Sequence, residues 1–135
     1  MKKILWFFIS VYIIFFSTFS VLRYRNMYAN YFDLGIMHHV VYNSYKALQT
    51  GDFGRFLEHT DPTGPTQLIR SAVHNDIILA LFAPLYFLYP SPEVLLVTQS
   101  VVLGLGALAV YGIGMHVLKK ITHPELYSLI FAVSY

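Results

Sequence analysis

Two long apolar segments without acidic or basic residues bracket a polar stretch of this chain. Residues 4–22 and 94–118 contain no Asp, Glu, Lys or Arg. An apolar helix of about 18 or more residues can cross a hydrocarbon layer of roughly 30 Å at about 1.5 Å per residue. The pattern therefore predicts transmembrane helices over 4–22 and 93–118, and it confines most of the polar chemistry to residues 23–76.

Composition supports a membrane protein and excludes other classes. Hydrophobic residues make up 56% of the chain and charged residues only 12%, whereas a soluble domain has about 25% charged residues. The net charge of +2 is small and its basic residues are dispersed, so we expect no nucleic-acid partner. The chain has no cysteine, which excludes disulfides and thiolate metal sites.

Paired lysines predict the orientation in the membrane. Lys2 and Lys3 precede the first segment, and Lys119 and Lys120 follow the second. Positive residues favour the cytoplasmic side, so we expect a multi-pass protein of the cell membrane with a cytoplasmic N-terminus. The first segment also has features of a secretory signal, but its length and the apolar segments that follow favour an uncleaved anchor.

A third apolar stretch, Ile77 to Tyr89, is too short to cross the bilayer and contains Pro84. As an α-helix it would be about 20 Å long. If both lysine pairs lie in the cytoplasm, the chain crosses the membrane an even number of times between them, and a third span would make that number odd. We therefore predict an interfacial or re-entrant helix here. Residues 23–76 then form an extracytoplasmic loop.

Helical periodicity recurs within this loop. Apolar residues from Leu34 to Leu48 return at spacings of three and four, which predicts an amphipathic helix over about 34–49. Asp33 stands directly before it as a predicted N-cap, and Gly51 follows as a helix stop. The Pro- and Gly-containing stretch 60–66 predicts an irregular loop.

The second long segment carries small residues on one face, and a further apolar segment follows it. Ser100, Gly104, Ala107 and Gly114 recur at spacings that predict a packing seam for another helix. Residues 124–135 are apolar after Glu125 and predict the start of a third transmembrane helix. We therefore expect the chain to be the N-terminal part of a larger multi-span protein.

Two arginines stand at the outer end of the first predicted span. The predicted extracytoplasmic position of Arg23 and Arg25 is contrary to the tendency of positive residues to lie on the cytoplasmic side. They are suited to binding a lipid phosphate, or simply to reaching the headgroups with their side chains. His38 and His39 are not a zinc-binding pair, because adjacent residues on a helix point about 100° apart.

Several short stretches of the sequence together point to a known family. They are Tyr31-Phe32-Asp33-Leu34-Gly35-Ile36, a helix ending in Thr50-Gly51, His74-Asn75-Asp76, Ala83 to Pro92, and Gln99 with Leu103 to Tyr111. With these residues the chain resembles, over roughly residues 23–120, a family of predicted prokaryotic membrane proteins, domain of unknown function 2079. That family in turn resembles the GT-C glycosyltransferases, which take a sugar from a polyprenyl-phosphate carrier at the outer membrane face. The resemblance implies an all-α integral membrane protein, the N-terminal part of a GT-C-like bundle with juxtamembrane helices in its first loop.

By this resemblance Asp33 is the catalytic candidate, as a base or as a ligand of a divalent metal ion. Cations are needed to stabilise the leaving phosphate. A second group of polar residues, His74 and Asp76, stands where the chain returns to the membrane. The alternative roles are helix capping for Asp76 and simple solvation for His74. The substrate-binding candidates are Arg23, Arg25, Arg70, His74 and Asp76.

A transporter or a non-catalytic membrane subunit that binds a lipid or partner through its outer loop is the alternative function. Transporters usually place charged residues near the bilayer midplane. Neither complete span contains one, which favours the transferase.

Overall fold

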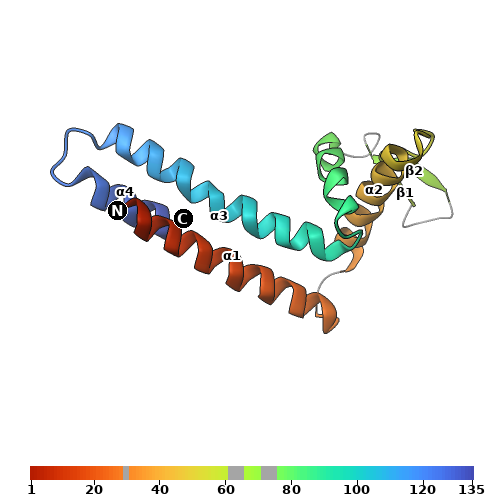
Figure 1. The fold of residues 1–135 in the computed structure, drawn as a ribbon, viewed down its shortest axis with the longest axis horizontal. Helices are drawn as coiled ribbons and strands as arrows, with labels where there is room; N and C mark the ends of the chain where they lie inside the picture. The colour runs from red at the N-terminus through yellow and green to blue at the C-terminus, as the bar shows by residue number, and fades with distance from the viewer. Residues whose placement is uncertain (29–30, 61–65, 71–75) are drawn as a thin grey trace. The chain divides into compact units, whose positions relative to one another are not determined.

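The computed structural model of the 135-residue chain describes residues 1–28, 31–60, 66–70 and 76–135 (Figure 1). Most of the chain is helical. It divides into two compact units, which we call the helix unit (Met1–Arg25 and Leu96–Tyr135) and the insert unit (Asn26–Leu95). The elements follow the order α1 (Lys2–Arg25), α2 (Tyr31–Thr50), β1 (Glu58–Thr60), β2 (Gln67–Ile69), the 3₁₀ helix η2 (Ile77–Phe87), α3 (Pro92–Val117) and α4 (Pro124–Ser134).

Helices α1 and α3 are long and apolar enough to cross a membrane. Their most apolar windows have mean hydropathies of 2.2 and 2.0, and only 11% and 22% of the residues in those windows are buried within the protein. The core helix of a soluble protein would instead be mostly buried. Helix α1 is longer than the predicted span 4–22 because its charged flanks also adopt helical structure.

Small residues on α3 let neighbouring helices approach closely within the helix unit. A Cβ atom added at Gly104 would lie 2.8 Å from Ile13 Cγ1, and one added at Gly114 would lie 2.8 Å from Ser128 Oγ. Ser100 and Ala107, on the same face, are buried. The predicted packing seam is therefore confirmed, with α1 and α4 as its partners.

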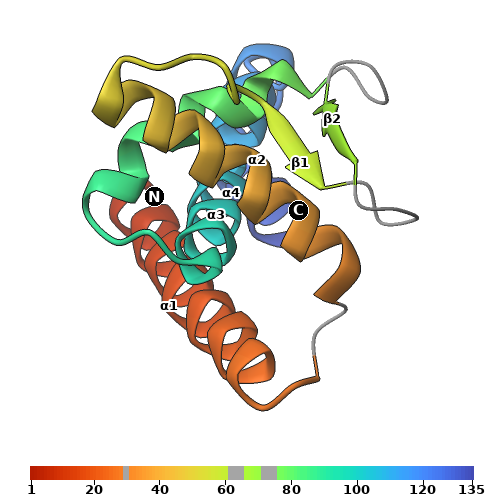
Figure 2. The same ribbon diagram turned by 90° about the vertical axis from the view of Figure 1, so that its right-hand side faces the viewer.

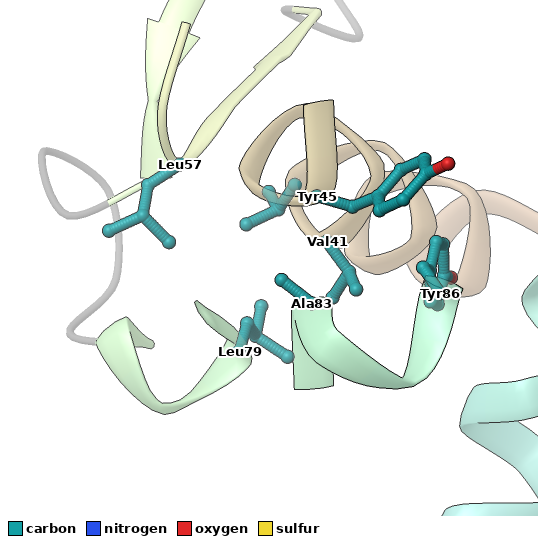
Figure 3. Close-up of a cluster of buried hydrophobic side chains, with 7 residues drawn as sticks. Val41, Tyr45, Leu57, Leu79, Ala83 and Tyr86 are labelled. Atoms are coloured by element: carbon teal, nitrogen blue, oxygen red, sulfur yellow. The ribbon is translucent and has the colours of Figure 1, made fainter. Parts of the chain in front are cut away.

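The insert unit is built around α2, with η2 and the hairpin β1–β2 packed along it (Figure 2). Its core joins Val41 and Tyr45 of α2 to Leu79, Ala83 and Tyr86 of η2 (Figure 3). Burial at spacings of three and four on both helices brings these side chains onto facing surfaces.

The hairpin was not predicted, so the all-α expectation is corrected to a mostly helical fold with one small sheet. Strands β1 and β2 are antiparallel, with His59 opposite Leu68 in the register. Each strand has three residues, too few for a period of two to be recognised in the sequence. Of the predicted loop 60–66, Thr60 belongs to β1, and residues 61–65 lie outside the described part.

The short apolar stretch folds as a 3₁₀ helix of 11 residues rather than an α-helix. Pro84 lies inside it, where it has no N–H to donate and its ring would crowd the carbonyl four residues earlier in an α-helix. At about 2.0 Å per residue such a helix is about 22 Å long, still short of the hydrocarbon thickness.

Candidate functional site

Asp33 lies in the first turn of α2, and its side chain is exposed. Because α2 begins at Tyr31, Asp33 is inside the helix rather than directly before it, and the N-cap prediction is wrong. A carboxylate in the first turn is still favoured by the positive end of the helix dipole. The structure thus presents Asp33 as a solvent-accessible carboxylate held on a regular element.

Arg23 and Arg25 occupy the last turn of α1, and both are exposed. The Arg23 guanidinium lies 5.7 Å from the centre of the Phe19 ring, a cation–π distance. Five residues separate the end of α1 from the start of α2. The two arginines and Asp33 therefore follow one another closely along the sequence.

Arg70 and Asp76 form an ion pair within the insert unit. Nη2 and Nε of Arg70 lie 2.6 Å and 2.8 Å from Oδ2 of Asp76, and both side chains are partly buried. Asp76 precedes η2, but its carboxylate makes no capping bond; its backbone carbonyl accepts the Leu79 N–H at 2.9 Å instead. The alternative role of Asp76, a side-chain cap of this helix, is therefore wrong. His74 lies outside the described residues.

His38 has a role that sequence reasoning missed. Its Nδ1 lies 2.8 Å from the hydroxyl of Tyr86, which is fully buried. In the Nε2–H tautomer of the neutral ring the hydroxyl donates to Nδ1, and in the Nδ1–H tautomer the ring donates to the hydroxyl oxygen. Burial, and secondly the charge of His39, lower the pKa of His38 below its ordinary value of 6.5. No local pattern signals this contact, because the two residues are 48 positions apart.

The lowered pKa of His38 makes the stability of the protein depend on pH. The unfolded chain takes up this proton near pH 6.5, whereas the folded chain takes it up only at lower pH, so stability is lost as pH falls below about 6.5. We expect His38→Gln to reduce this slope of the free energy of unfolding between about pH 7 and pH 5. His123→Gln, at an exposed position, is the control; equal slopes for wild type and His38→Gln would contradict the prediction.

His38 and His39 face different elements, as predicted from their adjacency. His38 contacts η2 through Tyr86, while His39 Nδ1 accepts the backbone N–H of Thr60 on β1 at 3.3 Å. Among the described residues, no group of three or more His, Asp or Glu side chains is arranged to hold a metal ion. A divalent ion at Asp33 would therefore need ligands from water, substrate or other parts of the protein.

The helix unit also contains an apolar cavity of about 540 Å³, lined by residues of α1, α3 and α4. Ile9, Phe16, Leu103 and Ala132 are among its lining residues. The lining is mostly apolar, and Tyr12 and Tyr135 contribute its side-chain hydroxyls.

Two exposed apolar helices of spanning length are consistent with an integral membrane protein. A sequence model of the family described as "Predicted membrane protein (DUF2079)" matches residues 23–135. This match covers most of the chain, and the protein belongs to that family. No curated protein and no solved structure gives a significant match.

Proposed function

We propose that the protein is a membrane glycosyltransferase that moves a sugar from a polyprenyl-phosphate donor to an acceptor on the extracytoplasmic face. The observation that carries this proposal is the exposed carboxylate of Asp33 in the first turn of α2, which begins six residues after the basic end of α1. Along the sequence, an acidic residue thus follows closely after two cations, which are the groups that the proposed reaction requires.

The proposed reaction uses these groups as follows. An acceptor hydroxyl attacks the anomeric carbon of the sugar, its proton passes to the Asp33 carboxylate, and the bond from the anomeric carbon to the phosphate oxygen breaks. The polyprenyl phosphate leaves with the bonding electrons, and Arg23 and Arg25 stabilise its charge. A divalent metal ion, if bound at Asp33, would lower the pKa of the acceptor hydroxyl.

Arg70 and Asp76 have a supporting place in this proposal. Their ion pair uses two of the guanidinium donors, so Arg70 can offer only its remaining N–H groups to a phosphate. We assign donor binding first to Arg23 and Arg25, because their side chains are exposed whereas the side chain of Arg70 is only 11% exposed. His74 and Asp76 stay second-rank candidates for contacts to the substrate.

The reaction requires the insert unit to lie outside the cell membrane, with the N-terminus in the cytoplasm. We expect Gln67→Cys to react with a membrane-impermeant maleimide in intact cells, and Lys120→Cys to react only after permeabilisation. Both positions are exposed, and the native chain contributes no background thiol. The reverse labelling pattern would place Asp33 in the cytoplasm and exclude the proposed site.

The activity itself is tested with the full-length protein reconstituted in lipid vesicles. A panel of polyprenyl-phosphate hexoses, each labelled in the sugar, is offered together with a membrane extract as the source of acceptor. Transfer that depends on the protein supports the proposal. No transfer from any member of the panel, or equal transfer from nucleotide sugars without a lipid carrier, would contradict it.

A further inference from the structure

One row of η2 side chains is apolar and faces away from the insert unit. A 3₁₀ helix has three residues per turn, so residues three apart lie in one row. Ile78, Leu81 and Phe87 occupy this row and are 62%, 73% and 55% exposed, and the adjoining Leu88 is 85% exposed. We call these four residues the η2 ridge.

The opposite side of η2 is already occupied. Leu79, Ala83 and Tyr86 are buried in the core that η2 forms with α2 (Figure 3). The hydroxyl of Tyr86 is also held by its hydrogen bond to His38. The η2 helix is therefore fixed to a partly polar unit by one side, while its other side presents large apolar side chains. Such a patch marks a surface that meets a membrane or a partner.

The chemistry of the ridge favours lipid over protein. Residues 77–92 contain no Asp, Glu, Lys, Arg or His, whereas protein interfaces usually have a polar rim around an apolar centre. Tyr89, directly after the ridge, is 54% exposed. Tyrosine is enriched where membrane meets water because its ring is apolar and its hydroxyl polar.

The chain connects the ridge directly to a membrane span. Helix α3 begins at Pro92, so only residues 88–91 separate it from the end of η2. These connecting residues reach at most about 18 Å. The ridge is thus continuous in sequence with a segment that enters the bilayer, and its end cannot lie far from the bilayer surface.

We propose that the η2 ridge is a lipid-binding surface that inserts into the interfacial layer of the outer leaflet and anchors the insert unit there. Packing of the opposite side of η2 on α2, together with the hydrogen bond between Tyr86 and His38, keeps the helix at this shallow depth. Anchoring would hold α2 and Asp33 near the headgroups. The proposal does not depend on the glycosyltransferase activity, because lipid contact is measured without substrate.

Tryptophan fluorescence tests this proposal on the full-length protein. Trp6 is the tryptophan of this chain, and it is changed to Phe together with any other tryptophan of the full-length protein. Leu81→Trp then reports from the ridge, and Gln67→Trp, at an exposed position of β2, is the matched control. Both variants are placed in phosphatidylcholine vesicles that contain lipid brominated either near the headgroup or near the end of the acyl chain.

We expect the fluorescence of Leu81→Trp to be quenched most by bromine near the headgroup and little by aqueous acrylamide. Gln67→Trp should show the reverse, with strong acrylamide quenching and little quenching by bromine. Leu88→Trp repeats the measurement at a second ridge position in case Leu81→Trp folds poorly. Strong acrylamide quenching at both ridge positions, protection from both quenchers by a protein partner, or strongest quenching near the acyl-chain end would each overturn the proposal.

Discussion

Asp33→Asn is expected to lower sugar transfer by the full-length protein by about a hundredfold or more. The amide has nearly the same size as the carboxylate but cannot accept the acceptor proton. Asp33 is exposed in the first turn of α2, so loss of its charge removes only a favourable dipole interaction of about 0.3–1 kcal/mol. The variant should therefore still fold while it loses sugar transfer. The initial rate of transfer measures that loss.

Asp52→Asn is the matched control for this experiment. Asp52 is also an exposed aspartate of the insert unit, and its Oδ1 accepts the N–H of Gly54 at 2.9 Å. Because Asn can accept the same bond, Asp52→Asn should transfer sugar at the wild-type rate. Unchanged transfer by Asp33→Asn would remove Asp33 from the mechanism, while equal losses in both variants would point to a general effect of the substitutions.

Variants of the arginine pair separate donor binding from proton transfer. Arg23→Gln combined with Arg25→Gln removes the cations proposed to hold the donor phosphate, which should raise KM for the donor. Asp33→Asn should instead act mainly on kcat, because the proton moves only during the chemical step. An unchanged KM in the double arginine variant would indicate that Arg23 and Arg25 contact lipid headgroups and do not bind the donor phosphate.

The positions of the long helices could be predicted from sequence because one physical limit sets them. A span must be long and free of charge to cross hydrocarbon, and α1 and α3 occupy the two segments that satisfy this. Local chemistry also favours the observed start of α3. Pro92 is its first residue, and the Ser91 hydroxyl accepts the Glu93 N–H at 3.4 Å, as expected for a capping serine.

The contacts of the candidate residues could not be predicted in the same way. The ion pair of Arg70 with Asp76 and the hydrogen bond between Tyr86 and His38 depend on how β2, η2 and α2 pack, which no local sequence period encodes. The start of α2 was missed for a different reason. Tyr31 continues the three-and-four spacing, but the carboxylate of Asp33 was interpreted as a cap, so the helix was started at Leu34 and Asp33 was placed before it instead of inside its first turn.

Tyr86→Ala is expected to be the most destabilising single change in the insert unit, with a loss of about 3–5 kcal/mol in the free energy of unfolding. Tyr86 is fully buried, and its ring lies near the rings of His38 and Tyr45 at centroid distances of 5.5 Å and 6.3 Å. Truncation would leave a cavity between η2 and α2. Chemical unfolding in detergent, followed by hydrogen exchange of the α2 amides, measures the loss.

Two comparison variants resolve what the Tyr86 side chain contributes. Tyr86→Phe keeps the ring and removes the hydrogen bond to His38, so it should cost only about 1 kcal/mol. Phe53→Ala removes an aromatic ring that is 57% exposed, and it should cost less than Tyr86→Ala because little apolar surface leaves the interior. If Tyr86→Ala cost no more than Phe53→Ala, η2 would not be packed on α2 as described, and the outward direction of the η2 ridge would lose its structural basis.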